Sequence, residues 1–262
     1  MTHTPRPGPP AEIDTTQTPQ APETPDARAA RKAAKGRSAN KTLNRWLRDA
    51  FSHRIDTPAQ RRLSHVYTQF FDHAVLRALW HNFAQVAPAL YRSNHPSRRR
   101  LQRYRDLGIT HVLTLRGGQS VAPYLFEAEA CRDFGMVFLQ IPLSAQRAPK
   151  RVRLLSLLDL FDEIESPLLI HCKSGADRTG LAAAMYLIHK QGVPAQEAKR
   201  ELSLRRLHAK WSKAGVLDLF MADLAAAEAR GVPMRRWIET EYDQDDTNRR
   251  FRAMGLAERL RL

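Results

Sequence analysis

The sequence predicts an α/β protein with a central, largely parallel, twisted sheet of about four to five strands, flanked by helices, with extra helices at both ends. Two observations lead to this fold class. Short apolar runs alternate with stretches of helical periodicity, which is the pattern of parallel strands joined by helices. One of these runs, 109–115 (ITHVLTL), is apolar and β-branched enough to be a buried central strand.

Composition divides the chain into four segments. Residues 1–42 form a proline-rich and then basic leader, which has too few large apolar side chains to fold and is expected to be disordered. Residues 43–63 are expected to be an amphipathic helix or a linker. The main domain is placed at 64–230, and a C-terminal helical extension at 231–262.

The first elements are set by proline positions. Thr57 and Pro58 have the N-cap and first-turn chemistry of a helix, and apolar residues extend the expected helix to Ala87. Pro88 closes it, because proline lacks the N–H group that a helix interior needs. The short run 89–93 (ALYRS) then predicts a strand.

The remaining elements alternate in order. An arginine-rich helix over 98–105 ends before Gly108, and the strand 109–115 follows. A helix over 123–134 precedes a strand over 136–143. Next come a leucine-rich helix, a strand, a helix capped by glycine, two more helices, and one or two helices near the end. They cover residues 150–164, 168–171, 179–190, 195–211, 216–230 and the residues after Pro233.

The charge balance favours anionic partners. The chain has 262 residues, with 42 Lys and Arg against 27 Asp and Glu, for a formal net charge of +15. Nucleic acid, an acidic membrane and a phosphorylated substrate are all compatible with this charge. Nucleic acid is the least expected, because the basic residues cluster in the tails and in 98–105 rather than among stacking aromatic residues.

Residues 28–54 are strongly basic, and their second half has an apolar stripe at helical spacing. Such a helix can lie on an anionic membrane, although packing of the stripe on the domain is the favoured alternative. The first residues lack the apolar core of a secretory signal. We therefore expect a cytoplasmic protein, with peripheral contact at the inner face of the membrane as a further hypothesis.

The ten residues from His171 to Gly180 (HCKSGADRTG) follow directly on the apolar run 167–170 (PLLI). They predict the end of a strand, a loop and the start of a helix. Backbone N–H groups in such a loop, together with the unpaired donors of the helix N-terminus, form a site for phosphate. The same donors stabilise a thiolate, so Cys172 is a candidate nucleophile. Arg178 supplies a planar guanidinium that can bind two phosphate oxygens.

Cys172, five intervening residues, Arg178 and Thr179 resemble the signature loop of the cysteine-dependent protein tyrosine and dual-specificity phosphatases. Over roughly residues 64–225 the chain resembles the bacterial atypical dual-specificity phosphatases. The further matching fragments are 90–93 (LYRS), 96–97 (PS), 108–109 (GI) and 112–117 (VLTLRG). The resemblance implies a largely parallel sheet with the loop at the carboxyl end of a central strand. It also implies hydrolysis of phosphomonoesters through a phosphocysteine intermediate, without a cofactor or metal.

The candidate site residues follow from this loop. Cys172 is the expected nucleophile, and Arg178 and the loop amides are expected to bind the phosphate oxygens. The resemblance implies that the Thr179 hydroxyl assists hydrolysis of the intermediate. His171 is expected to orient the loop by hydrogen bonding. Arg147 is a candidate substrate contact and Arg116 a candidate brace, although both fit structural roles equally. The phosphate-binding loop residues are Lys173, Ser174, Gly175, Ala176 and Thr179.

The leaving oxygen needs a proton from a general acid. In many tyrosine phosphatases an aspartate on a separate loop supplies it, but the corresponding loop here, 144–149 (SAQRAP), contains no carboxylate. Asp177, directly before Arg178, is the best-placed candidate, as the resemblance to some lipid phosphatases of the superfamily implies. The alternative is that Asp177 caps the helix through the backbone of Thr179 or Gly180.

Three functional interpretations stay open. The first is a protein-tyrosine or dual-specificity-like phosphatase, and the second is a phosphatase for phosphoinositides or other lipid phosphates, which Asp177, Lys173 and the basic leader favour. The substrate is thus a phosphorylated protein, lipid or small molecule. A catalytically silent phospho-binding module is the third, and the presence of Cys172 and Arg178 argues against it.

The other cysteine, Cys131, lies 41 positions before Cys172, and the chain has no CxxC spacing. Two cysteines are too few for a disulfide framework or a zinc site, which indicates a reducing compartment. Cys131 is expected to be a buried apolar side chain. A disulfide with Cys172 that protects the nucleophile from oxidation is the alternative.

Overall fold

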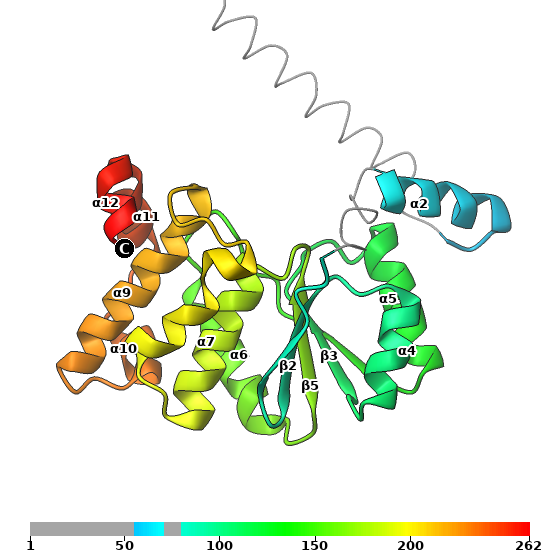
Figure 1. Cartoon of the computed structure of the whole chain (residues 1–262), viewed down its shortest axis with the longest axis horizontal. Coiled ribbons are helices and arrows are strands. Elements are labelled where there is room, and N and C mark those ends of the chain that lie inside the picture. The colour runs from blue at the N-terminus through cyan, green and yellow to red at the C-terminus, as the bar shows by residue number, and fades with distance from the viewer. Residues whose placement is uncertain (1–54, 71–79) are drawn as a thin grey trace, which may run out of the picture. The chain divides into compact units, whose positions relative to one another are not determined.

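The computed structural model describes residues 55–70 and 80–262 (Figure 1). The leader 1–42 and the basic segment 28–54, with its hypothetical membrane contact, lie outside the described residues. None of the helices within the described ranges is long and apolar enough to cross a membrane. The division of the chain into four segments stays a prediction.

One sheet organises the described residues, with the strand order β1-β2-β5-β3-β4. β1 pairs with β2 in antiparallel orientation, and the other neighbours are parallel. Helices cover the sheet on both sides (Figure 1), so the predicted fold class is confirmed. The strands are β1 (Ala84–Ala87), β2 (Leu90–Asn94), β3 (His111–Thr114), β4 (Val137–Gln140) and β5 (Leu168–Cys172).

β5 is the central strand, and all of its residues are buried. Successive side chains of a strand point to opposite faces, and here Ile170 and Leu169 belong to different apolar clusters. Ile170 faces the larger cluster, which contains α6, α7 and α9 side chains, whereas Leu169 faces the smaller one beside α4 and α5. The strand that carries Cys172 at its carboxyl end is therefore held from both faces. These helices are α4 (Arg98–Asp106), α5 (Ala122–Asp133), α6 (Arg151–Glu163), α7 (Asp177–Gln191) and α9 (Val216–Ala229).

The chain after α9 forms three helices rather than the expected one or two: α10 (Met234–Thr240), α11 (Gln244–Ala253) and α12 (Leu256–Arg261). Aromatic residues from this segment complete the larger core cluster. The Tyr242 hydroxyl donates to the carbonyl of Pro149 at 2.6 Å, and the Asn248 side chain accepts from the N–H of Ala148 at 2.9 Å. The C-terminal segment thus fixes the loop between β4 and α6.

The helix expected from Thr57 to Ala87 is wrong at its end. α2 (Pro58–Phe70) begins as predicted, with reciprocal side-chain and backbone hydrogen bonds between Thr57 and Gln60. Ala84–Ala87, however, is strand β1, which pairs with β2 across the turn at Pro88. Apolar periodicity did not separate the two possibilities, because a short Ala-Gln-Val-Ala run fits either helix or strand, and pairing with β2 decides it.

The single helix expected over 195–211 is also wrong. The chain instead forms α8 (Ala195–Ala198) and short 3-10 turns, including η1 (Lys199–Glu201) and η2 (Leu204–Arg206), and Leu207 takes a left-handed conformation with φ of 64°. The carbonyls of Glu201 and Arg206 accept hydrogen bonds from side chains near the phosphate loop. Tertiary hydrogen bonds therefore replace the helical ones in this segment.

Candidate active site

The loop 173–176 connects the carboxyl end of β5 to the N-terminus of α7. This is the position where ligands bind in open α/β sheets, since helix N-termini and loop amides gather at that edge. β5 lies between β2 and β3, which places Asn94 beside Cys172 and Thr114 beside His171. The expected strand, loop and helix are all present.

Cys172 is buried, with 1% of its surface exposed. Burial by itself raises the pKa of its thiol, but the charge of Arg178, the hydroxyl and backbone N–H of Thr179 and the backbone N–H of Gly175 outweigh it, so the pKa lies below its usual value. The geometry therefore favours an anion at the sulfur position. A thiolate held this way is a nucleophile.

Arg178 lies in the first turn of α7. Its Nη1 atom donates to the carbonyl oxygen of Leu115 at 3.3 Å, and this contact connects the guanidinium to the chain just after β3. Its Nε atom is buried without a hydrogen-bond partner among the described residues. A donor of this kind beside a thiolate can bind an oxygen of a phosphate dianion.

Two side chains that the sequence analysis did not predict bind the backbone of the phosphate loop at the Gly175 carbonyl. Arg92 is fully buried in β2 and donates to the Gly175 carbonyl at 2.6 Å, while it also pairs with Glu201. The Asn82 amide donates to the same carbonyl at 2.9 Å and to the Arg206 carbonyl at 3.0 Å. Burial lowers the pKa of Arg92, and the charge of Glu201 opposes this. Arg92 falls in the fragment 90–93, whereas no sequence signal marks Asn82.

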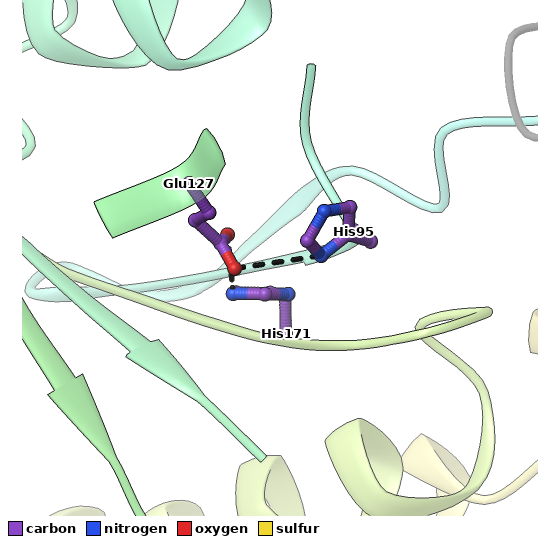
Figure 2. A group of neighbouring side chains, drawn as sticks. All are labelled: His95, Glu127 and His171. Carbon is purple, nitrogen blue, oxygen red and sulfur yellow. Dashed lines mark ion pairs between the residues drawn. The ribbon is translucent and has the colours of Figure 1, made fainter. Parts of the chain in front are cut away.

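Glu127, in α5, contacts His171, the residue directly before Cys172. Figure 2 shows its carboxylate reaching toward the imidazole rings of His95 and His171. The Oε1 atom lies 2.8 Å from Nε2 of His171, and Oε2 lies 3.4 Å from Nδ1 of His95. All three residues are buried. The loop-orienting role of His171 stays a prediction, and Glu127 is its observed partner.

The same three residues bear on metal binding. Their ligating atoms lie within 4.8 Å of one another, and no other such group occurs among the residues that the structure describes. Two imidazoles and a carboxylate form a ligand set that suits Zn²⁺. Nε2 of His171 and Oε1 of Glu127 are already 2.8 Å apart without an ion. The expectation of no metal stays a prediction.

Asp177 begins α7, but its side chain does not cap the helix. The N-cap residue is Ala176, and no side-chain cap bond is present. Instead, the Oδ1 atom of Asp177 lies 2.7 Å from Nδ1 of His208, and Nε2 of His208 lies 2.6 Å from a carboxylate oxygen of Asp218. No local sequence pattern marks this contact, because His208 is 31 positions from Asp177.

The other predicted site residues lie in the phosphate loop, in α7 and in two further loops. Lys173, Ser174 and Ala176 lie in the loop, where the Ser174 hydroxyl accepts from the N–H of Ala176 at 3.3 Å. Thr179 is buried in α7. Arg116 is half-buried just after β3, and Arg147 is exposed in the carboxylate-free loop 144–149. Their proposed roles stay predictions.

Both cysteines are free, so the disulfide alternative is wrong. Cys131 belongs to the smaller apolar cluster and Cys172 to the larger one, on the other face of the sheet. Burial, reinforced by the charge of Glu127, raises the pKa of Cys131 above its usual value. Cys131 is therefore an inert apolar side chain, as expected.

A family model described as "Swiss Army Knife protein, DSP-PTPase phosphatase domain" (PTP-SAK) matches residues 83–215. The chain belongs to this family. The match includes β1 to β5, the loop, α7 and His208. The predicted resemblance to dual-specificity and tyrosine phosphatases is thereby confirmed.

The chain is also similar to individual proteins over part of its length. The dual specificity protein phosphatase TpbA of Pseudomonas aeruginosa is 32% identical over 152 residues, which cover 57% of this chain and 62% of TpbA. The chain thus matches less than two thirds of that relative. A crystal structure of P. aeruginosa TpbA is 24% identical with a TM-score of 0.44, covering 66% of this chain and 91% of that one. A putative phosphatase of Shewanella putrefaciens is 20% identical with a TM-score of 0.46, covering 56% and 90% respectively.

The close approach of the loop to β2 predicts a specific effect at Gly175. Its φ is +72°, and an added Cβ would lie 2.7 Å from both the N of Asn94 and the O of Ser93. Gly135 is a matched control, because its φ is +66° and nothing lies within 4 Å of an added Cβ. Alanine at either position carries the left-handed cost of about 1–2 kcal/mol, and Gly175→Ala adds steric overlap of about 1–3 kcal/mol. Urea unfolding measures the difference, and equal losses would contradict the close approach.

Proposed function

We propose that this protein hydrolyses phosphomonoesters through a phosphocysteine intermediate on Cys172. The observation that carries the proposal is the position of the buried Cys172 thiol at the end of β5, where Arg178, Thr179 and loop amides all favour an anion at one point. These donors suit a phosphate dianion equally well. A silent phospho-binding module does not need an activated thiolate, so this observation favours an enzyme.

The reaction has two steps. The Cys172 thiolate attacks phosphorus, the bond from phosphorus to the leaving oxygen breaks, and that oxygen departs with the electron pair and takes a proton. Water then attacks the phosphocysteine and gives a proton to the Asp177 carboxylate, the S–P bond breaks, and the thiolate and inorganic phosphate result. Arg178 and the loop amides bind the equatorial oxygens in both steps. Asp177 is the proposed proton donor in the first step, because the facing loop 144–149 offers no carboxylate.

Phosphorylated proteins are the proposed main substrate class. The relative TpbA is named as a dual specificity protein phosphatase, and the family model is a DSP-PTPase domain. The site needs only a phosphate dianion that can reach the thiol.

Replacing the proposed nucleophile or phosphate clamp tests the proposal. We expect Cys172→Ser to abolish turnover of p-nitrophenyl phosphate, because the serine hydroxyl stays protonated at neutral pH. Arg178→Lys is expected to reduce kcat about 100-fold or more, because lysine cannot bind two phosphate oxygens in a planar fork. Cys131→Ala is the control and should retain turnover. Wild-type turnover by Cys172→Ser would rule out the phosphocysteine mechanism.

One observation favours lipid phosphates as a second candidate. Leu204, Leu207 and Trp211 are exposed, and they alternate with Arg205, Arg206 and Lys210 in the segment 204–211. This segment is connected to the phosphate loop through Asn82, which donates to both the Arg206 and the Gly175 carbonyls. Exposed apolar and basic side chains together bind anionic membranes. The hypothetical membrane contact through residues 28–54 would act in the same direction.

The two substrate classes are distinguished by the surface segment. If lipid phosphates are the substrate, Leu204→Ser with Leu207→Ser should reduce turnover of a phosphoinositide in anionic vesicles at least tenfold, while turnover of p-nitrophenyl phosphate stays unchanged. Phosphotyrosine peptides serve as the comparison substrate. A vesicle rate that is far below the peptide rate in the wild type, and that the substitutions do not change, would reject the lipid candidate.

A further inference from the structure

A histidine between two aspartates lies behind the phosphate loop. His208, which follows η2, is 2% exposed, and its two ring nitrogens face carboxylate oxygens of Asp177 and Asp218 at 2.7 and 2.6 Å. Asp218, in α9, is also 2% exposed, whereas the side chain of Asp177 is 23% exposed. The cluster therefore runs from the buried Asp218 to the partly exposed Asp177, which directly follows the phosphate loop.

The distances determine the charge of the ring. A neutral imidazole has one N–H donor and one bare nitrogen, and a bare nitrogen facing a carboxylate oxygen at such a distance would be repelled. Both nitrogens therefore carry protons, and His208 is an imidazolium between two carboxylates. Burial by itself lowers the pKa of His208, but hydrogen bonds to Asp177 and Asp218 and their charges raise it to about 9.

We propose that His208 is a positioning residue for Asp177, with Asp218 anchoring the far side of its ring. This inference rests on the proposed phosphatase function. The Nδ1–H group of His208 donates to the Oδ1 atom of Asp177. The other carboxyl oxygen of Asp177 is left to carry the proton that goes to the leaving oxygen in the first step, and to take a proton from the attacking water in the second. Asp177 and His208 belong to α7 and to the segment after η2, so packing of that segment sets the position of the carboxylate.

The contact prevents a competing conformation. An aspartate in the first turn of a helix readily binds the exposed N–H groups there, and the helix dipole favours it. Those N–H groups, including that of Thr179, are the ones that stabilise the Cys172 thiolate. By holding Asp177 away from them, His208 leaves these donors for the thiolate and the phosphate. His208 therefore affects both the position of Asp177, the proposed acid, and the N–H groups that bind the thiolate and the phosphate.

Loss of the His208 proton would release Asp177 rather than Asp218. One of the two hydrogen bonds must disappear, and an unpaired carboxylate costs more in the buried position of Asp218 than at Asp177, which water reaches. Within residues 55–70 and 80–262, the charged groups that face His208 are these two aspartates, from α7 and α9. Lys199, in η1, interacts electrostatically with Asp218 and supports its charge.

The cluster also has a pH signature. The folded-state pKa of His208 lies above the ordinary value of about 6.5, so the stabilisation is fully present below about pH 6.5 and is lost as the pH rises through about 9. Positioning of Asp177 should be lost over the same upper range. An alkaline decrease of kcat near pH 9 would therefore report His208.

A double-mutant cycle tests the proposal. We expect His208→Gln to reduce kcat for p-nitrophenyl phosphate about 10- to 100-fold with little change in KM, because the carboxylate is misplaced and not removed. In an Asp177→Asn background the same substitution should have no further effect on kcat, because His208 acts through Asp177. The alkaline decrease near pH 9 should be absent from both single variants. His111→Gln, at the start of β3, is the control and should retain wild-type kcat.

The proposal would be overturned if kcat of the double variant fell by the product of the two single-variant factors. A His208→Gln kcat within twofold of wild type would also overturn it. A titration of the imidazole signals of the full chain by NMR separates this outcome from failure of the proposed function, because it needs no turnover and no folded variant. Titration of His208 near pH 9 supports the imidazolium pair even if no substrate is hydrolysed. Titration near the ordinary pKa of about 6.5 overturns the positioning role even if the enzyme is active.

Discussion

Burial of a negative charge at the carboxyl end of β5 is the constraint on which the site depends. Cys172 is 1% exposed, and a thiolate there is stable only if donors replace the water that it loses. Arg178, the Thr179 hydroxyl and the amides of Gly175 and Thr179 provide them. These groups are rigid because β5 is packed from both faces and α7 begins directly after the loop.

The rest of the structure maintains the shape of that loop. Arg92 and Asn82 bind the Gly175 carbonyl, and only glycine leaves room for the backbone of β2 at this position. The irregular segment after α8 supplies the carbonyl acceptors and the carboxylate that complete these contacts. The segment 195–211 therefore departs from the expected helix where its residues bind Asn82 and Arg92, the two side chains that contact the phosphate loop.

Local sequence patterns predicted the fold class, most strands, the loop and its free cysteine and arginine. The strand β1 was missed because pairing with β2, rather than its own periodicity, makes it a strand. Glu127 and His208 were missed because each reaches the site from a distant part of the chain, through a contact that no local motif encodes. A helix cap by Asp177 was the local alternative to its role as the acid, and the contact with His208 takes the place of that cap.

The central claim is that the loop stabilises a thiolate on Cys172 despite its burial. The most direct measurement is the pH dependence of alkylation of the native protein by iodoacetamide, with each cysteine followed by peptide mapping. Cys172 should react with an apparent pKa below the ordinary thiol value of about 8.5, inorganic phosphate should protect it, and Cys131 should stay unmodified. An apparent pKa for Cys172 at or above the ordinary value would contradict the account.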